Sequence, residues 1–439
     1  MALSRYSTSI HGETRYKSVA EFGHSIVWRA NAFRVRRGSI AEVSRMKQAL
    51  SGVKVLDFGR YIAAPWCAAI LADLGADVIR VERLEGGEDR WVTPLSETGD
   101  GAMFLQCNRN KTSLTLNPQT PEGAEVKRRL VSEADVVIVN LPEAALISLG
   151  LDYETLRAIK PDLIFVLGTA YGTGGPYSDR LGYDGIGQVM SGAIYRTGTP
   201  EAPMRCAVPY ADYGTAMCLA AGTMAALYHR ERTGEGQKVE GALLSTSLMM
   251  SNGMVMEQAV LKPDRVPIGN RGYAGAPSDL YRATDGYVLV QIVGQAQFKR
   301  WCRMIGEDHW LSDPLYADDG LRGVNNKALN DRMQEWCDGR TKAEIVAALE
   351  EVRIPACSMY TLDEVLADEH IKKMGYYHYT DYPGLPKQAP IVETPFRMSE
   401  TPGTIRSRAP TIGEHTDEIM KDLGYSAAEI ADLREKQVI

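Results

Sequence analysis

An acidic residue, Asp212, stands just before a long run of apolar and small residues, 214–232, which is typical of a buried helix. A carboxylate there has two possible roles. It can cap the helix by accepting hydrogen bonds from free backbone N–H groups, or it can attack an activated carbonyl while the positive end of the helix dipole keeps it ionised. Gly214 would leave room for a ligand to reach the backbone. The spacing alone favours the cap.

Cysteine and histidine, the other residue types that often carry chemistry, are dispersed along the chain. There are seven of each, with no Cys-x-x-Cys and no His-x-x-x-His pair. This pattern predicts no zinc site or other metal centre, and the odd number of cysteines indicates a reducing compartment.

The 439 residues are enough for two or three domains, with an ordinary globular share of 44% hydrophobic and 24% charged residues. The formal net charge of −7 argues against a nucleic-acid partner. The uncharged runs 214–228 and 241–256 are shorter than the roughly 18 to 20 residues of a membrane span, so no membrane partner is predicted either.

Residues 1–48 differ from the rest of the chain, because they hold nine basic and only three acidic residues. Such an Arg-rich segment fits an organellar transit peptide or, preferably, an extension without a folded role. A natural start at Met46 is a third possibility. We therefore predict an N-terminal extension and a cytoplasmic protein, or an organellar matrix protein if residues 1–48 are a transit peptide.

The elements that must position Asp212 follow a β–α pattern. Strands are predicted at 53–58, 77–82, 112–116, 135–140 and 163–167, and helices at 67–74 and 121–133. This alternation predicts an α/β fold with a Rossmann-like parallel sheet. Glu82 has the spacing of a ribose-binding acid, but the turn after the first strand lacks Gly-x-Gly-x-x-Gly, so a nicotinamide site is not expected.

The pattern changes after residue 256. A glycine-rich loop at 269–277 precedes a predicted strand at 287–292 and amphipathic helices at 295–305, 326–337 and 341–352. We read 261–382 as a smaller α+β domain and 415–437 as a charged helical tail.

A series of ordered matches to a known family runs from about residue 51 to residue 439. The matches include the stretch 52–82, Asn110 with Lys111, Asp135 with Asn140, Gly172 with Gly175 and Pro176, Gly234 with Gly236, and Gly413 with Glu414 and His415. In these residues the chain resembles the class III (CaiB/BaiF) CoA-transferases, the group that includes formyl-CoA and carnitine CoA-transferases.

The resemblance implies a large domain built from residues 49–250 and 395–439, an inserted smaller domain, and an interlocked homodimer. It also implies transfer of CoA from an acyl-CoA thioester to a free carboxylic acid through an aspartyl-CoA thioester. Asp212 would be the nucleophile, and coenzyme A would enter as a thioester substrate rather than as a tightly bound cofactor.

Five further positions resemble the family's CoA-binding residues. Arg83 would lie near the CoA phosphates, which suit its charge, Asn140 and Tyr183 would contact CoA, and Ala63 and Leu116 would form apolar walls. A solvated arginine, a turn asparagine and a packed tyrosine are the structural alternatives. The loop with Gly269, Gly272 and Gly275 resembles a mobile loop over the active site, although a surface turn fits it equally well.

The chain departs from the family at Ile62, where a glutamine is frequent, and at Ser148, where a basic residue is frequent. The resemblance to formyl-CoA transferases therefore does not imply that this chain uses oxalate as its acceptor. The main alternative is an α-methylacyl-CoA racemase, which needs a His-Asp pair where this chain has Tyr183 and Asp184. Tyrosine phenols ionise at about pH 10 and exchange protons poorly near neutrality. A silent acyl-CoA-binding scaffold and a dinucleotide enzyme are weaker alternatives, and no residue identifies the acyl donor or acceptor.

Overall fold

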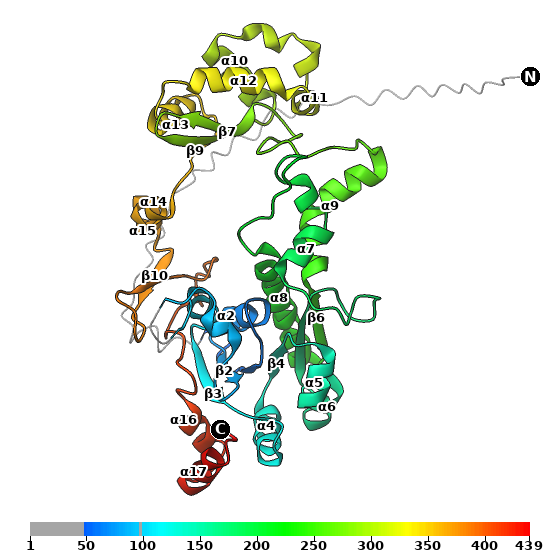
Figure 1. Cartoon of the computed structure of the whole chain (residues 1–439), viewed down its shortest axis with the longest axis vertical. Helices are drawn as coiled ribbons and strands as arrows, with labels where there is room; N and C mark the ends of the chain where they lie inside the picture. The colour runs from blue at the N-terminus through cyan, green and yellow to red at the C-terminus, as the bar shows by residue number, and fades with distance from the viewer. Residues whose placement is uncertain (1–47, 96–98) are drawn as a thin grey trace, which may run out of the picture. The chain divides into compact units, whose positions relative to one another are not determined.

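A parallel sheet of six strands forms the centre of the larger part of the protein (Figure 1). The computed structural model describes residues 48–95 and 99–439, so the predicted extension 1–48 lies almost wholly outside the described residues. The strands lie in the order β3-β2-β1-β4-β5-β6. Their bounds are β1 Lys54–Asp57, β2 Asp77–Glu82, β3 Lys111–Thr115, β4 Val136–Val139, β5 Ile164–Thr169 and β6 Lys238–Ala242.

All strand pairs in this sheet are parallel, as the alternating sequence pattern predicts. The chain runs outward from β1 in one direction through β2 and β3, and in the other through β4, β5 and β6. This order reverses between β1 and β4, as it does in a Rossmann sheet, and ligands of such sheets bind outside the carboxyl ends of the strands at the reversal.

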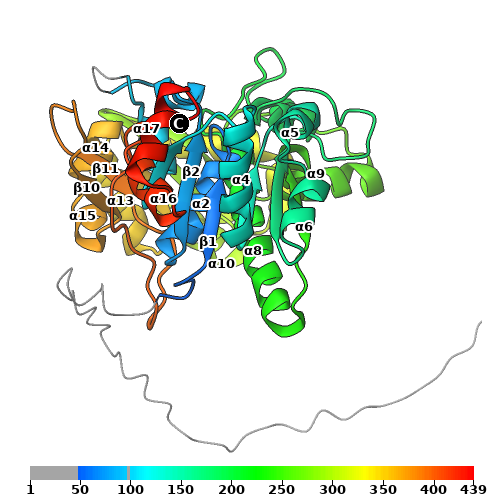
Figure 2. The same ribbon diagram turned by 90° about the horizontal axis from the view of Figure 1, so that it is seen from below.

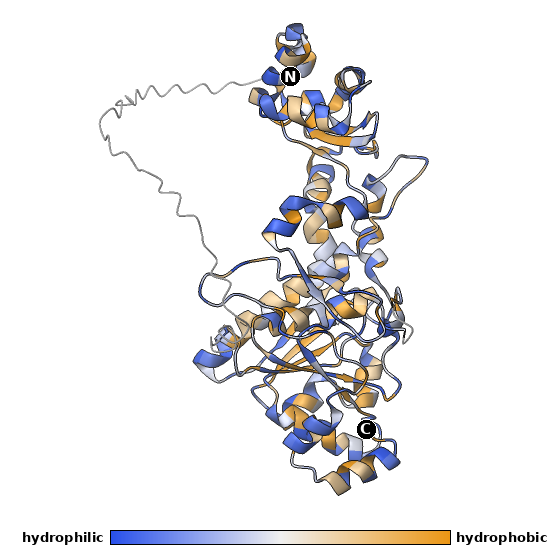
Figure 3. Ribbon diagram, turned by 90° about the vertical axis from the view of Figure 1, so that its left-hand side faces the viewer, coloured by the Kyte–Doolittle hydropathy of each residue, from blue (hydrophilic) through white to orange (hydrophobic). Residues whose placement is uncertain are grey.

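Helices cover both faces of the sheet because alternate strand residues point to opposite sides. Val136 and Ile138 belong to the apolar core on one face, with helices α2 and α8, whereas Val137 and Val139 belong to the core on the other face, with α4, α5 and α6. The strands are accordingly among the most hydrophobic segments in Figure 3. The helices of this part are α2 Ala63–Asp73, α3 Ala102–Cys107, α4 Pro121–Glu133, α5 Glu143–Leu149, α6 Tyr153–Ile159, α7 Asp184–Met190, α8 Tyr210–Thr233 and α9 Leu243–Leu261.

The C-terminal segment packs against the same sheet. Helices α16 (Thr416–Asp422) and α17 (Ala427–Glu435) bury Met420 and Leu433 in the core that contains α4 (Figure 2). The backbone N–H of Asn117 donates to the carbonyl of Val438 at 2.8 Å. Residues separated by about 300 positions in sequence therefore share one core.

A second hydrophobic core lies between residues 276 and 354. Its three-stranded antiparallel sheet has the order β7-β8-β9 and is accompanied by helices around Trp301 and Met333. The elements are β7 Ser278–Ala283, β8 Gly286–Gln291, α10 Gln295–Ile305, α11 Asp319–Val324, α12 Asn326–Cys337, α13 Lys342–Glu351 and β9 Ala356–Ser358.

The chain then returns through α14 Leu362–Ala367, α15 Glu369–Met374 and the antiparallel pair β10 Tyr377–Thr380 and β11 Ala389–Val392. Tyr382, which follows β10, shares a cluster with Phe104 of α3. The domain limits 49–250 with 395–439 and 261–382 stay a prediction. Within the described ranges, no helix is long and apolar enough to cross a membrane.

A buried group of charges at the β2 side of the sheet connects it to the C-terminal segment. The Arg90 guanidinium donates to both oxygens of Glu82 at 2.6 and 2.9 Å, to Asp100 at 2.9 Å and to the Pro410 carbonyl at 3.3 Å. Burial favours the neutral acid, but the hydrogen bonds from Arg90 lower the pKa of Glu82 to about 2. Glu82 is thus engaged by Arg90 and Ser113 inside the protein, in agreement with the expectation that it does not bind a ribose.

Replacing Arg90 by methionine should destabilise the fold strongly, because buried Glu82 would lose both hydrogen bonds from Arg90 and keep only the more distant Arg80, 3.6 Å away, as a cationic partner. We expect a loss of about 3 to 5 kcal/mol in the free energy of unfolding, measured by urea denaturation. The matched control is Arg83→Met, since the Arg83–Glu88 ion pair is 58% and 50% exposed and should contribute less than about 1 kcal/mol. Similar small losses in both variants would contradict this account.

Candidate functional site

The candidate site lies at the carboxyl ends of β1 and β4, where the strand order reverses. Here the side-chain amide of Asn140, just after β4, accepts from the backbone N–H of Arg60 and donates to its carbonyl, both at 2.8 Å. The loop after β1 is thereby tied to the loop after β4. Asn140 holds this turn together, and whether its side chain also contacts CoA stays a prediction.

Helix α8 begins beside these loops, and its first residues form part of a small apolar junction. Ala211 packs with Ala63 at the start of α2 and with Leu243 at the start of α9. Because α2 follows β1 and α9 follows β6, the chain brings the N-terminal ends of three helices together at this point. Ala63, a predicted apolar wall, therefore lies next to the first turn that carries Asp212.

Asp212 is the third residue of α8, so the expectation that it precedes the helix as a cap is wrong. The helix begins at Tyr210, and the residue before it, Pro209, offers no side-chain acceptor. The acceptor comes from another helix: Oδ1 of Asp184 accepts from the backbone N–H groups of Ala211 at 2.8 Å and Asp212 at 3.2 Å. These are the amides that an N-cap side chain normally satisfies.

Gln188, one turn further along α7, holds Asp184 and the approach to α8. Its amide donates to Oδ2 of Asp184 at 2.5 Å, and its Oε1 accepts from the backbone N–H of Cys206 at 3.0 Å. Both Asp184 and Gln188 are buried, with 7% and 1% of their surface exposed. The first turn of α8 is therefore fixed by a buried pair of side chains from α7.

The carboxyl group of Asp212 is half-buried and close to the Asp184 carboxylate. Burial, followed by the negative charge of Asp184, raises the pKa of Asp212 from 3.8 to about 7. The expectation that the helix dipole keeps Asp212 ionised well below neutrality is thus wrong. Burial is the main reason, and the Asp184 carboxylate adds to it, because it repels a second negative charge and accepts from the amides of Ala211 and Asp212 at the start of the helix.

Gly214 does not provide space for a ligand, contrary to its expected role. It is buried between α8 and α9, where an added Cβ would lie 2.5 Å from Cε of Met250 and 2.9 Å from Cγ2 of Thr246. The glycine allows the close approach of the two helices, which fixes the helix that carries Asp212.

Two tyrosines lie at the outer side of the site. Tyr61 follows β1, and its ring meets the ring of Tyr183 edge to face, with centroids 5.6 Å apart. Tyr183 directly precedes α7 and is 67% exposed. Burial and the neighbouring Tyr183 raise the pKa of Tyr61. The exposed face of Tyr183 is free of the core, as a substrate-contacting side chain requires.

The comparison with known proteins identifies this arrangement. The model of CoA-transferase family III matches residues 50–416. The chain belongs to family III of the CoA-transferases. It is 33% identical over 398 residues to a succinate–glutarate CoA-transferase from Agrobacterium fabrum, a match that covers 88% of this chain and 98% of that protein.

Two further proteins extend this relationship. A formyl-CoA:oxalate CoA-transferase from Bradyrhizobium sp. is 32% identical, with 89% of this chain and 97% of that protein covered. The crystal structure of a CaiB/BaiF family protein from Brucella suis superposes with a TM-score of 0.76 and 34% identity, covering 86% of this chain and 100% of that one. The α/β parallel sheet predicted from the sequence is confirmed by the strand order, and the predicted enzyme class by the family match. CoA-transferases of this family use CoA thioesters as substrates.

The remaining two predicted CoA-binding residues, Arg83 and Leu116, have no hydrogen bond to Asp212. Arg83 follows β2 and forms an exposed ion pair with Glu88 at 2.9 Å, which leaves its charge accessible. Leu116 follows β3, is 2% exposed and packs in the core of the face that contains α4. Its backbone N–H donates to the carbonyl of Glu82 at 2.9 Å.

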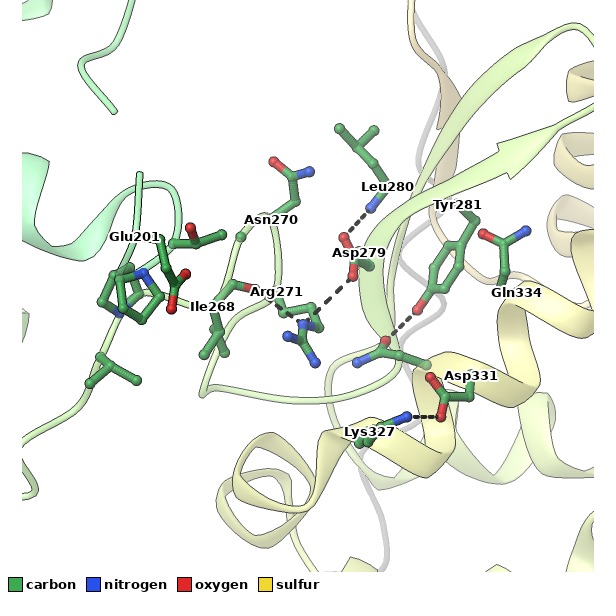
Figure 4. A pocket seen from close by; sticks show the side chains of 16 residues that line it. Glu201, Ile268, Asn270, Arg271, Asp279, Leu280, Tyr281, Lys327, Asp331 and Gln334 are labelled. Carbon is green, nitrogen blue, oxygen red and sulfur yellow. Dashed lines mark hydrogen bonds and ion pairs between the residues drawn. The ribbon is translucent and has the colours of Figure 1, made fainter. Parts of the chain in front are cut away.

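The glycine loop of the transferase borders a separate open hollow of about 830 Å³ (Figure 4). Gly269 and Asn270 line it, together with charged residues that pair with one another, such as Lys327 with Asp331. None of the residues that we expect to carry the chemistry lines this hollow. The site at Asp212 and the mobility of the loop both stay predictions.

Sequence reasoning missed the roles of Asp184 and Gln188. In the sequence, Asp184 is notable solely as half of the Tyr-Asp pair that stands where a racemase has His-Asp, and no motif marks Gln188. One sequence signal does point to them: Pro209 leaves the start of α8 without a side-chain cap, so a distant acceptor is required. Within residues 48–95 and 99–439, no cluster of His, Cys, Asp and Glu is suited to a metal ion.

Because the unfolded carboxyl group ionises near its usual pKa of 3.8 and the folded one at about 7, the folded state binds the extra proton between these pH values. The stability that Asp212 contributes is therefore present below pH 3.8 and is lost as the pH rises through 7. We expect Asp212→Asn, which cannot ionise, to raise the free energy of unfolding at pH 8 by at most about 4 kcal/mol relative to the natural protein.

Urea denaturation at a series of pH values measures this effect, and the gain should fade toward pH 4. The exposed Asp179 provides the control, because Asp179→Asn makes the same chemical change away from α8. A difference between natural protein and Asp212→Asn that stayed constant across this range would show that the carboxyl group is not perturbed.

Proposed function

We propose that this CoA-transferase moves CoA from an acyl-CoA thioester to a free carboxylic acid through an aspartyl-CoA thioester on Asp212. The observation that carries the proposal is the half-buried carboxyl group of Asp212, whose pKa of about 7 makes it both available as an anion and reactive. A carboxylate held at this pKa by burial and a like charge is poorly stabilised, and it gains more than an ordinary aspartate from forming a covalent bond.

The proposed reaction is a series of acyl exchanges. The ionised Oδ of Asp212 attacks the thioester carbonyl, the carbon–sulfur bond breaks, and CoA leaves as a thiolate, which gives a mixed anhydride. The thiolate then attacks Cγ of Asp212 and releases the donor acid, leaving aspartyl-CoA. The acceptor carboxylate attacks Cγ in turn, the carbon–sulfur bond of aspartyl-CoA breaks, and a second mixed anhydride forms. The released thiolate attacks the acyl carbon of the acceptor in this anhydride, which gives the new acyl-CoA and frees the Asp212 carboxylate. Each step forms one acyl bond and breaks another, so electrons and protons balance.

The residues around Asp212 suit the binding of CoA thioesters in this proposal. Arg83 would supply charge to the CoA phosphates, while Asn140 and Tyr183 would contact CoA at the reversal of the strand order. Ala63 would line the acyl site directly, because it packs against Ala211. Leu116 would support the wall from within the core.

The names of the relatives suggest the substrate class. One relative is a succinate–glutarate CoA-transferase, and two from Chloroflexus aurantiacus are named succinyl-CoA–L-malate and succinyl-CoA–D-citramalate CoA-transferases. We therefore propose succinyl-CoA as the donor and a short dicarboxylic acid as the acceptor.

A homodimer is proposed as the working form. Helix α9 exposes apolar side chains along much of its length, with Met249, Met256 and Val260 exposed by 61%, 56% and 73%. An apolar helix face of this kind supports a protein partner, and the interlocked arrangement implied by the family resemblance makes a second copy the natural one.

The transfer reaction is tested with succinyl-CoA and a panel of carboxylic acids, followed by mass identification of new thioesters. We expect the natural protein to form a dicarboxylic acyl-CoA, and Asp212→Asn to lose at least about a thousandfold in rate, because an amide oxygen is a feeble nucleophile. The matched control Asp179→Asn should retain the rate.

An α-methylacyl-CoA racemase remains the second candidate, because Asp212 could also move a proton beside a thioester. The structure gives one observation against it: Asp184, the second half of the pair that a racemase requires, is occupied by two backbone amides and Gln188. Deuterium incorporation from solvent into the α-carbon of a 2-methylacyl-CoA, without acceptor acid, would overturn the transferase proposal.

A further inference from the structure

The carboxylate of Asp184 satisfies three hydrogen-bond donors and yet belongs to no ion pair among the described residues. Its Oδ1 accepts the amides of Ala211 and Asp212, and its Oδ2 accepts from Gln188. Neutral acceptors such as serine or asparagine cap helices equally well. A buried charge therefore exceeds what capping requires, since burying a carboxylate is costly.

We propose that Asp184 is a positioning residue for Asp212, which holds the first turn of α8 and, through its negative charge, keeps the Asp212 carboxylate unstabilised and reactive. Asp184 occupies the amides at the positive end of α8, and those amides would otherwise stabilise an anion at Asp212. That Asp184 makes Asp212 more reactive rests on the proposed function of Asp212. That the charge of Asp184 acts on the Asp212 carboxyl group does not depend on that function.

The groups around the two carboxylates agree with this role. Asp184 is the charged group that acts on Asp212. Tyr213 and Cys107 face Asp212 as uncharged groups whose pKa values are raised by burial. Tyr210, whose pKa burial also raises, lies near Asp184 and Cys206. Among the cations of this region, Arg109 lowers the pKa of both Tyr213 and Cys107 against the effect of burial, and the Cδ of Arg205 lies 3.9 Å from the position that a Cβ on Gly185 would take.

The charge coupling is tested without any activity assay. Thermal unfolding at pH 8 is measured for the natural protein, Asp212→Asn, Asp184→Asn and the double variant. We expect the rise in Tm caused by Asp212→Asn to shrink clearly, though by less than half, when Asp184 is already asparagine, because the like charge has gone while burial, the larger cause, stays. An equal rise in both backgrounds would overturn the proposal, whatever reaction the protein catalyses.

The consequence for catalysis is tested by the pH profile of CoA transfer. In Asp184→Asn the pH of half-maximal activity should fall by about one unit, while the rate above pH 8 should fall several-fold, because Asp212 becomes the weaker base. A residue that merely holds the helix would lower the rate without moving the profile. An unmoved profile in a folded Asp184→Asn protein would therefore overturn the proposal.

Asparagine at position 184 places its amide nitrogen opposite the donor of Gln188, which could prevent folding. In the double variant Asp184→Asn with Gln188→Glu, the new side-chain amide at position 184 donates to the new carboxylate at position 188. The hydrogen bond between the two positions is restored, and the negative charge moves from position 184 to position 188. We expect this variant to fold and to keep the lowered pH of half-maximal activity. A profile identical to that of the natural protein would contradict the role of the Asp184 charge. The exposed Asp179→Asn serves as the control in each series.

Discussion

The hydrogen bonds from the start of α8 to a carboxylate on another helix are the contact on which the site depends. Pro209 leaves the first amides of this long helix without a local acceptor, and Asp184 supplies one from α7. The same contact has two consequences. It fixes the turn that carries Asp212, and it places a second negative charge beside the Asp212 carboxyl group, whose pKa rises to about 7 through burial and this charge.

The sheet determines where this contact lies. The parallel strand order reverses between β1 and β4, and the side chain of Asn140 ties the two loops that open there. Helices α2, α8 and α9 begin beside these loops and meet through Ala63, Ala211 and Leu243. The helix that carries Asp212 is held in turn by close packing, because Gly214 lets α9 approach without a side chain between them.

Most of the sheet could be predicted from the sequence, because β4 and β5 are largely apolar runs and valine, leucine or isoleucine recur in β1 and β2. Strand β6 could not, since Lys238 and Glu240 give this edge strand little apolar character. The position of Asp212 was predicted only to within a turn. Its surroundings depend on Asp184, which lies 28 residues away in sequence, and no local pattern shows that this carboxylate, rather than Asp212, accepts the helix amides.

The central claim is that Asp212 itself carries the transferred group. The most direct measurement is to mix the protein with succinyl-CoA, add hydroxylamine, digest the quenched sample and determine the mass of the peptide that contains Asp212. The account predicts a hydroxamate on Asp212, because hydroxylamine attacks an anhydride or thioester at Cγ. Continued CoA transfer with an unmodified Asp212 peptide, or a hydroxamate on another residue, would contradict it.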